Sequence, residues 1–323
     1  MSEVLSRRGF LGGVAAAGTV LGVAPWARAV GAAAVVDPNA PAAAAGTLLI
    51  GGDLQVSRMG FGAMRITGDG IWGEPRDANE AFAVLRRAVQ LGTNFIDTAD
   101  AYGPFISERL IREALYPYPR GLLIATKGGQ VRPRQSEWVP DGRPEHLRAA
   151  CESSLARLKL ERIDLYQFHR PDPQVPFEDS IGELAKLQKE GKIRHIGVSN
   201  VNTEQLAKAR ALVKVVSVQN RYNVADRSSD DVLAVCERDQ IAFLPWGPLA
   251  QSAQAGGTNK SLVALEAIAK ERNIDNNEAA LAWLLTRSPV MLPIPGTSQV
   301  KHLEDNVGAA KIKLTPGEMA QVG

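Results

Sequence analysis

The sequence predicts an α/β fold, a (β/α)8 barrel with an N-terminal β-hairpin. Short apolar runs alternate with amphipathic stretches from residue 59 to the end of the chain, and such alternation favours a parallel sheet. Eight strand-then-helix units fit into about 260 residues, the usual length of this kind of barrel. A doubly wound open sheet is the alternative, and it is weakened because no Gly-x-Gly-x-x-Gly motif follows an early strand.

The strands are predicted by short runs that are rich in apolar and β-branched residues. Thr47–Ile50 and Leu54–Val56 flank the pair Gly51–Gly52, which is typical of a hairpin turn. The eight barrel strands are expected at Met59–Met64, Phe95–Ile96, Leu122–Thr126, Leu165–Phe168, Ile193–Val198, Val215–Gln219, Ile241–Pro245 and Val290–Ile294.

Helices are predicted where apolar residues recur every three or four positions. They are expected at Asp77–Leu91, Ser107–Leu115, Pro144–Leu158, Pro176–Lys189, Thr203–Leu212, Ser228–Cys236, Leu262–Glu271, Asn276–Leu285 and Gln299–Ala309. Ser107 and Thr203 are the expected N-caps of two of them. Pro144 lies in a first turn, where proline is tolerated, and Gly191 is expected to terminate the helix that precedes it.

The first 29 residues have the organisation of a twin-arginine-type signal peptide. The segment Arg7–Leu11 carries paired arginines before Phe and Leu, and a small-residue apolar run follows over 12–24. Ala27–Ala29 then fits a cleavage site. A disordered, Ala-rich start is the alternative. We expect residues 30–45 to be a disordered linker and residues 46–323 to form the barrel.

The signal predicts a partner and a location. The twin-arginine export machinery is the expected partner, with export after folding in the cytoplasm, or retention in the cytoplasm if the signal is inefficient. The apolar run is short for a membrane span, so no stable insertion of the mature protein is expected.

Composition argues against several functional classes. The formal net charge is only +2, so no basic field favours nucleic acid. The two cysteines, Cys151 and Cys236, lie in separate helical patterns without metal-ligand spacing. Two buried thiols are therefore expected, with no disulfide and no metal.

Four polar residues follow consecutive strands and suggest acid–base chemistry on a carbonyl group. Asp97 and Tyr102 follow the second strand, Lys127 ends the third and His169 ends the fourth. A Tyr hydroxyl can protonate a carbonyl oxygen, and a nearby Lys is expected to lower its pKa from about 10. A neutral His can orient the same oxygen. Taken singly, these residues could be a cap, a surface Tyr, a solvated Lys and a core His; their common place at strand ends favours catalysis.

From about residue 46 to its end the chain resembles the aldo-keto reductase family. The resemblance rests on Asp97-Thr-Ala-x-x-Tyr102-Gly, Gly197-Val-Ser-Asn, and Ile294-Pro-Gly-Thr-Ser followed by His302-Leu-Glu-Asp-Asn306. It implies that Tyr102 is the general acid/base, that Lys127 and Asp97 tune it, and that His169 orients the carbonyl. The stretches starting at Gly73 and Ile111 are similar to a bacterial branch near the pyridoxal reductases.

The resemblance also implies NADPH as cofactor, with NADH possible because Gly296 and His302 stand where some members carry Lys and Arg. The implied cofactor-binding residues are Gly62, Met64, Asp97, Ser199, Asn200, Gln219, Trp246, Gly247, Leu249, Gln251, Gly296, Thr297, Ser298, Lys301, His302 and Asn306. Ser199, Asn200 and Gln219 would bind the carboxamide, and Trp246 would stack on the nicotinamide.

A small-molecule aldehyde or ketone is the expected substrate. Its pocket is expected to be walled by Met64, Trp72, Tyr102, Gln130, Trp138 and His169. The polar, Pro-containing segment 128–143 is interpreted as a mobile substrate loop, in which Arg132 and Arg134 either attract an anionic substrate or are solvated. The chain stops at Gly323, soon after the last expected helix, so an open and permissive site is expected.

Three functions are compared. The first is an NAD(P)H-dependent reductase of aldehydes or ketones. The second is a cofactor-binding redox sensor or partner subunit with little turnover. The third, a phosphate-binding barrel isomerase, is weak because no Glu base stands at a strand end.

Overall fold

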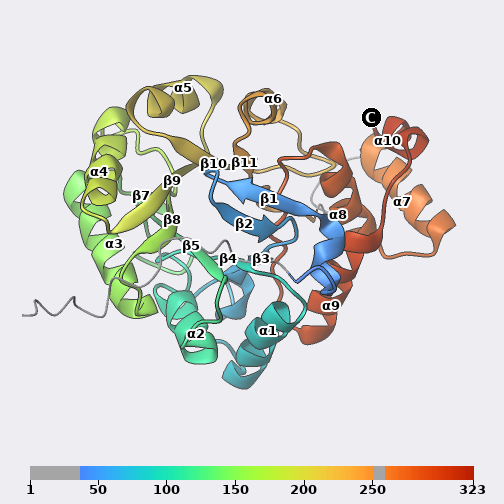
Figure 1. The fold of residues 1–323 in the computed structure, drawn as a ribbon, viewed down its shortest axis with the longest axis horizontal. Helices are drawn as coiled ribbons and strands as arrows, with labels where there is room; N and C mark the ends of the chain where they lie inside the picture. Colours follow the sequence, from blue (N-terminus) through green and yellow to red (C-terminus); the bar gives the residue numbers. More distant parts are fainter. Residues whose placement is uncertain (1–36, 250–258) are drawn as a thin grey trace, which may run out of the picture. The chain divides into compact units, whose positions relative to one another are not determined.

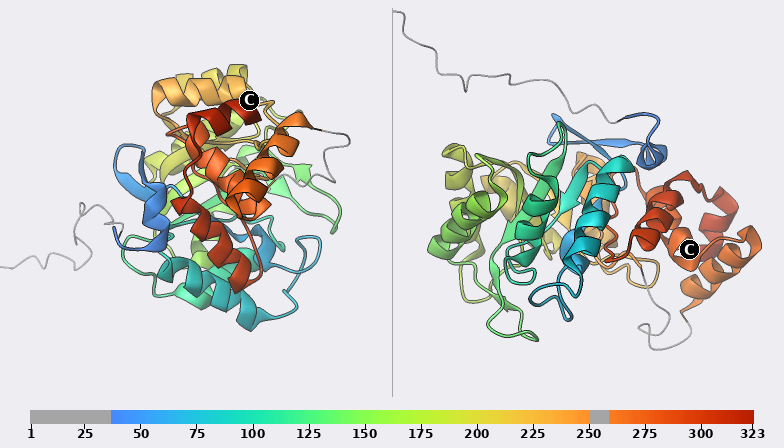
Figure 2. Two further views of the ribbon diagram at one scale, coloured as in Figure 1. Left: turned by 90° about the vertical axis from the view of Figure 1, so that its right-hand side faces the viewer. Right: turned by 90° about the horizontal axis from the view of Figure 1, so that it is seen from below.

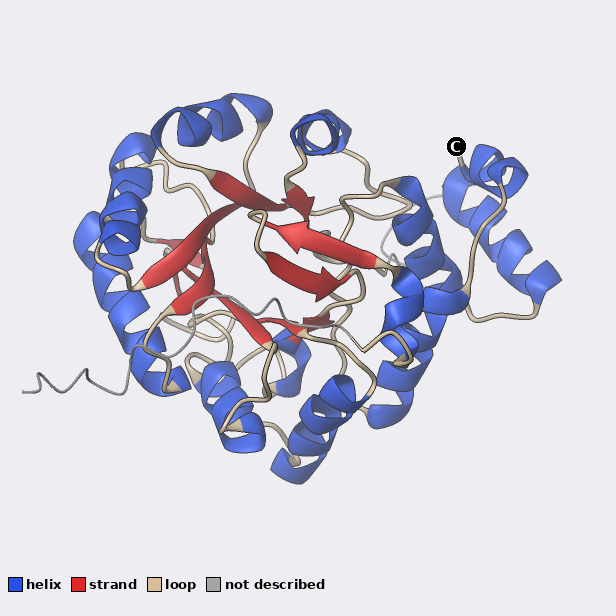
Figure 3. Cartoon of the chain, in the orientation of Figure 1, coloured by secondary structure: helices blue, strands red, loops and turns tan. Residues whose placement is uncertain are grey.

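The computed structural model describes residues 37–249 and 259–323, and these residues form the predicted barrel (Figure 1). Seven parallel strands follow one another in the order β11-β10-β9-β8-β5-β4-β3. Helices surround this sheet on its outer side (Figure 3). The predicted signal peptide at residues 1–29 lies outside the described residues.

The strands agree with the predicted runs to within a few residues. The hairpin is β1 (Thr47–Ile50) and β2 (Leu54–Ser57); the barrel strands are β3 (Phe61–Gly62), β4 (Phe95–Asp97), β5 (Leu123–Gly128), β8 (Ile163–Phe168), β9 (Ile193–Ser199), β10 (Val215–Gln219) and β11 (Ala242–Phe243); β6 (Gln130–Val131) and β7 (Val139–Pro140) form a second hairpin.

The helices also follow the predicted order, and a further helix, α10, follows the last predicted one. The α-helices are α1 (Ala78–Gln90), α2 (Ile106–Leu115), α3 (Pro144–Leu158), α4 (Phe177–Lys189), α5 (Thr203–Leu212), α6 (Asp230–Asp239), α7 (Lys260–Arg272), α8 (Asn276–Arg287), α9 (Val300–Gly308) and α10 (Pro316–Val322); the 3-10 helices are η1 (Pro41–Ala45), η2 (Ala63–Ile66) and η4 (Ala309–Lys311).

The eighth strand is replaced by an extended segment, residues 290–295, that closes the barrel without being a regular strand. On one side, Phe243 N–H donates to Val290 O and Leu292 N–H donates to Phe243 O. On the other side, Gly60 N–H donates to Pro293 O at 3.0 Å. Pro293 and Pro295 have no N–H to donate, so a full ladder cannot form here. This is why the predicted strand Val290–Ile294 is reduced to a bridge at Met291.

The hairpin β1–β2 covers one end of the barrel, and the long loops that carry the site project from the other end (Figure 2). Its turn uses Gly51 and Gly52 at φ of 68° and 94°, values that favour glycine. Ile50 and Val56 pack with buried side chains from inside the barrel, such as Leu165. The hairpin is therefore a hydrophobic plug, which leaves the opposite end free for chemistry.

The local signals explain most helix ends, but two predicted caps are wrong. Asn202, not Thr203, caps α5, because its side chain accepts from Gln205 N–H in a capping box. Ser107 lies inside α2 and is fully buried; its hydroxyl donates to Ala63 O at 3.1 Å. The Ser107 hydroxyl therefore makes a tertiary contact instead of the helix cap that the local pattern predicted.

Two further expectations are corrected. The linker predicted to be disordered over 30–45 ends earlier, because Pro41–Ala45 forms η1 and Ala42 is bonded at both ends: its N–H donates to Leu91 O and its carbonyl accepts from Ser57. The segment 128–143, expected to be a mobile substrate loop, is not loop throughout, since it contains the paired strands β6 and β7; its mobility stays a prediction.

The two cysteines are free and buried, as predicted. In the part of the chain that the structure describes, no helix is long and apolar enough to cross a membrane.

Candidate active site

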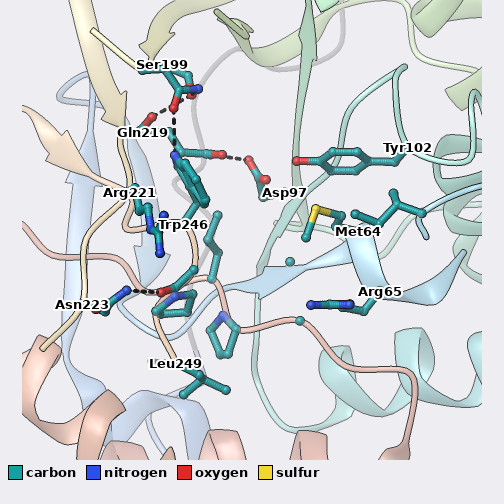
Figure 4. A pocket seen from close by; sticks show the side chains of 18 of the residues that line it. Met64, Arg65, Asp97, Tyr102, Ser199, Gln219, Arg221, Asn223, Trp246 and Leu249 are labelled. Carbon is teal, nitrogen blue, oxygen red and sulfur yellow. Dashed lines mark hydrogen bonds between the residues drawn. The ribbon is translucent and has the colours of Figure 1, made fainter. Parts of the chain in front are cut away.

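A cavity of about 1060 Å³ opens at the carboxyl ends of the barrel strands. In Figure 4, Tyr102 and Asp97 lie together on one wall, and Trp246 and Arg221 lie on the facing wall. The predicted site residues that line this cavity are Gly62, Met64, Asp97, Tyr102, Gln130, Trp138, His169, Ser199, Asn200, Gln219, Trp246, Gly247, Leu249, Gly296, Thr297 and Ser298.

Lys127 is fully buried and is not itself among the residues that line the cavity, but it joins three neighbours, of which Asp97 and Tyr102 line it. Its Nζ donates to Asp97 Oδ2 at 2.6 Å, to Thr98 O at 2.8 Å and to the Tyr102 hydroxyl at 3.2 Å. The strand register explains the contact. Asp97 pairs with Ala125 across β4 and β5, and Lys127 is two residues further on, so it shares the face of Ala125 and points into the barrel.

The second oxygen of Asp97 is held by two buried amides. Gln219 Nε2 donates to Asp97 Oδ1 at 2.8 Å, and Gln167 Nε2 donates to it at 3.0 Å. Gly197 makes room for Gln167, because a Cβ at position 197 would lie 2.9 Å from Gln167 Cγ. Asp97 therefore has three charge-satisfying donors, counting Lys127, and its orientation toward Lys127 is fixed.

Gln167 is a functional residue that the sequence reasoning missed. The signal was present, because a Gln in a fully buried strand is unusual unless its amide has partners. Gln219 was predicted to bind the carboxamide of a nicotinamide. Its amide nitrogen donates to Asp97 and to Gln167, so Gln219 also holds the carboxylate of Asp97; its carboxamide role stays a prediction.

Charge and burial set the protonation of the pair Lys127–Tyr102. Burial raises the pKa of Tyr102 above its ordinary value of 10, and the positive charge of Lys127 only partly offsets this. Lys127 therefore lowers the pKa of Tyr102 as expected, but burial raises that pKa by more. Burial alone would lower the pKa of Lys127, but Asp97 and Tyr102 outweigh it and raise that pKa. Tyr102 thus keeps its proton and Lys127 keeps its charge at neutral pH.

His169 faces Tyr102 and is neutral. The two rings are 5.9 Å apart at their centroids and almost perpendicular. Burial lowers the pKa of His169 well below 6.5, and the charges of Lys127 and Arg170 lower it further. The backbone of His169 is held on both sides: its N–H donates to Gly128 O, and its carbonyl accepts from Asn200 Nδ2 at 3.0 Å.

A connected set of hydrogen bonds holds the facing wall. Asn200, in the left-handed region at φ 58°, donates to Ser199 Oγ and accepts from Trp246 Nε1 at 3.0 Å. Ser199 donates in turn to Gln219 O at 2.7 Å. The guanidinium of Arg221 lies 5.7 Å from the centre of the Trp246 ring. The indole is therefore held in one orientation against the cavity.

The far end of the cavity is formed by residues 295–298, just before α9. Gly62 and Gly296 approach closely there, because a Cβ on Gly296 would lie 2.5 Å from Gly62 O. Thr297 is buried, and Thr297 and Ser298 both line the cavity. This end combines hydroxyl groups with a helix N-terminus, an arrangement that suits phosphate.

Several predicted residues lie elsewhere. Lys301 is 84% exposed and pairs with Asp305 at 3.7 Å. Lys301, His302, Asn306 and Trp72 are not among the residues that line the cavity, and Gln251 lies outside the described residues. Their assigned roles stay predictions.

The cavity also contains residues that the sequence reasoning did not assign to it. They are Arg65, Ile71, Arg170, Arg221, Asn223, Ala225, Asp226, Pro248, Ile294 and Pro295. All but Ile294 lie in the loops that follow predicted strands, and this position was the available signal. Their contribution depends on loop conformation, which local sequence does not specify.

Comparison with known proteins agrees with this geometry. The model described as "Aldo/keto reductase family" matches residues 58–323. An uncharacterized oxidoreductase of Schizosaccharomyces pombe is 51% identical over 281 residues, covering 87% of this chain and 90% of that protein. Pyridoxine 4-dehydrogenase of Escherichia coli is 41% identical over 271 residues, covering 82% of this chain and 93% of that protein.

A solved structure extends the comparison. An aldo-keto reductase from Klebsiella pneumoniae, in complex with NADPH, matches with a TM-score of 0.72 and 26% identity, covering 85% of this chain and 93% of that chain. The family match, the barrel and the joined side chains of Asp97, Lys127 and Tyr102 all agree. The chain therefore belongs to the aldo/keto reductase family.

Proposed function

We propose that Tyr102 is the general acid of this NADPH-dependent aldo-keto reductase, which reduces aldehydes or ketones to alcohols. One observation carries the proposal: Lys127 Nζ lies 2.6 Å from Asp97 and 3.2 Å from the hydroxyl of Tyr102, and both of these partners line the cavity. A protonated Tyr beside a fixed positive charge can donate its proton as negative charge develops on a carbonyl oxygen.

Each residue has a separate role in the transfer of a hydride and a proton to the carbonyl group. The cofactor, when bound, supplies a hydride to the carbonyl carbon. Tyr102 gives its proton to the carbonyl oxygen, and the resulting phenolate is stabilised by Lys127 until water returns a proton. His169, as a neutral imidazole, donates a hydrogen bond that orients the oxygen. Asp97 keeps Lys127 charged and in place.

The cavity fits a dinucleotide cofactor together with a small substrate. Its volume of about 1060 Å³ is at the upper end of ordinary ligand sites, which span about 300–1,000 Å³. The fixed indole of Trp246 offers a flat apolar surface on the wall that faces Tyr102, and Arg65, Arg170 and Arg221 supply positive charge along the lining. Asn200 and Ser199 would hold the nicotinamide end, and Thr297 and Ser298 the phosphate end.

NADPH is the proposed cofactor, with NADH as the weaker substrate. The Klebsiella pneumoniae relative is in complex with NADPH, which supports this choice. Lys301 lies outside the cavity lining. The positive charge that binds the 2′-phosphate of NADPH, which NADH lacks, is therefore expected from Arg65, or from Lys301 if its side chain moves toward the cavity. We expect a preference for NADPH that is moderate, within about a hundredfold in kcat/KM, because few cations line that end.

The proposed substrates are aromatic aldehydes, including pyridoxal-like compounds. The Escherichia coli relative is named pyridoxine 4-dehydrogenase, and Trp138, Tyr102 and Ile71 give this chain an aromatic and apolar substrate wall. Flat aromatic rings pack well against such a wall.

Export by the twin-arginine machinery is a further part of the proposal. It is supported by the paired arginines at Arg7 and Arg8 and by the Ala27–Ala29 motif. Because this route moves folded proteins, a cofactor bound in the cytoplasm would be carried across. Fractionation of cells that express the full chain, with Arg7→Lys/Arg8→Lys as control, tests it: equal distribution of both proteins would contradict export.

The reductase is tested by following absorbance of the reduced nicotinamide during turnover. Residues 30–323 are supplied with NADPH or NADH and with 4-nitrobenzaldehyde or pyridoxal. Tyr102→Phe should reduce kcat by about 10²–10⁴-fold and leave NADPH binding within twofold. Tyr116→Phe, at a half-exposed tyrosine outside the cavity, is the matched control. Full turnover in Tyr102→Phe, or tight NADPH binding without oxidation by any carbonyl, would contradict the proposal.

A further inference from the structure

Arg132 was expected to be a substrate-attracting or solvated loop arginine, but it is buried. Only 6% of it is exposed. Its guanidinium lies 3.7 Å from the centre of the Trp138 ring and 5.5 Å from that of Trp72. A guanidinium this close to two indole rings is held by cation–π attraction to both. The proposed mechanism assigns it no role.

The same guanidinium connects two loops that are far apart in the sequence. Arg132 belongs to the β6–β7 hairpin, and it donates to Ile71 O at 3.1 Å and to Gly70 O at 3.2 Å. It also donates to Gln135 O within its own hairpin. The side chain of Gln135 makes a further contact with the other loop, because its Nε2 donates to Asp69 O at 2.7 Å. The segment 67–73 is therefore tied to the hairpin.

The tied segment is strained at a residue of the cavity. Ile71 has φ of 59°, a conformation that costs a β-branched residue energy and persists only when surrounding contacts enforce it. Its carbonyl accepts from Arg132 and from Gly103 N–H. Gly103 is next to Tyr102, so the strained loop is joined to the catalytic loop as well. Ile71 itself lines the cavity.

Trp138 connects Arg132 to the proposed general acid, Tyr102. Its ring meets the Tyr102 ring edge-to-face at 6.3 Å between centroids, and both line the cavity. A change in the position of Arg132 would therefore move the wall beside the reacting carbonyl. It would leave Lys127 and Asp97 in place, because their hydrogen bonds do not involve the hairpin.

We propose that Arg132 is a specificity-determining positioning residue: it clamps segment 67–73 to the β6–β7 hairpin and so holds Ile71 and Trp138 as a rigid wall that selects flat aromatic carbonyl substrates over small aliphatic ones. The inference rests on the proposed reductase function for its kinetic part. Its structural part, the clamp, is independent of turnover.

The test compares Arg132→Lys and Arg132→Ala with Arg134→Ala. Arg134 is in the same hairpin but is 81% exposed and pairs only with Glu137 in the described chain. With NADPH, KM for 4-nitrobenzaldehyde should rise at least tenfold in both Arg132 variants, while kcat/KM for propanal and the Kd for NADPH change less than threefold. Lys keeps the charge but not the planar fork, so wild-type selectivity in Arg132→Lys would overturn the proposal.

Hydrogen exchange gives a readout that needs no turnover. Amides of residues 67–73 should exchange at least tenfold faster in both Arg132 variants and remain unchanged in Arg134→Ala; unchanged exchange in Arg132→Ala overturns the clamp. If the Arg132 variants do not fold, Trp138→Leu replaces them. Loss of the preference for 4-nitrobenzaldehyde over propanal in that variant supports the wall, and an unchanged preference overturns it. Absence of all turnover in the wild-type protein would refute the reductase and leave the exchange result to decide the clamp.

Discussion

Replacement of Lys127 by Met should damage both activity and stability. Lys127 is fully buried and its Nζ is 2.6 Å from Asp97. Met keeps the length of the stem but leaves the buried carboxylate without its counter-charge. Breaking a buried pair in this way costs about 3–5 kcal/mol. For a domain of this size about 2–4 °C of Tm is lost per kcal/mol, so Tm should fall by roughly 6–20 °C.

The loss of activity has a separate cause. The phenolate that forms on Tyr102 loses its stabilising charge, and the uncompensated Asp97 opposes its formation. We expect kcat to fall by about 10²–10⁴-fold, the range for general acid catalysis. The two glutamines still hold Asp97 in Lys127→Met, so NADPH binding should change by less than threefold.

A double variant separates the two effects. Asp97→Asn/Lys127→Met removes both charges, so it should recover part of the stability lost in Lys127→Met while remaining inactive. Calorimetric scans and single-turnover oxidation of NADPH measure the two quantities. A Tm of Lys127→Met within 2 °C of the wild type, or activity above a tenth of it, would refute the reasoning.

Other predictions concern the histidine and two glycines. Burial lowers the pKa of His169 well below 6.5. The stability that neutral His169 contributes is therefore fully present above pH 6.5 and is lost as the pH falls from 6.5 toward the depressed pKa. Urea unfolding midpoints should decline less over this range in His169→Asn than in the wild type, and equal declines would argue against a neutral His169. Gly296→Ala should destabilise the protein by about 1–3 kcal/mol, because its Cβ would lie 2.5 Å from Gly62 O. Gly182→Ala, inside α4 with nothing within 4 Å of its Cβ, should stabilise it by about 0.5–1 kcal/mol; equal effects of the two substitutions in urea unfolding would contradict the assignment of Gly296 to a close backbone approach.

Features that depend on residue order were predictable from the sequence. The barrel followed from alternating periodicities, and the hairpin from Gly51–Gly52 between two apolar runs. The sequence alone predicts that Asp97, Lys127 and His169 lie close together, because parallel neighbouring strands bring their carboxyl ends to one edge. Burial of Cys151 and Cys236 followed from their place in helical patterns.

Features that depend on side-chain direction and dielectric environment required the tertiary structure. Gln167 and Gln219 hold Asp97 because two strands far apart in the sequence face one point inside the barrel. Burial raises the pKa of Tyr102 more than Lys127 lowers it, and the desolvation of a buried group cannot be read from the order of residues.

The loops show the same limit most clearly. Arg132 looked like a solvated charge because its neighbours in sequence are polar, yet it contacts Ile71 across 61 positions of the chain. The strain at Ile71 contradicts its local preference, and only packing from elsewhere maintains it. The sequence by itself thus determined where the chemistry lies, through the order of strands and their polar ends. Only the tertiary structure decided the protonation states of the side chains, their hydrogen-bond partners and the residues that form the cavity wall, because those properties arise from contacts between distant segments.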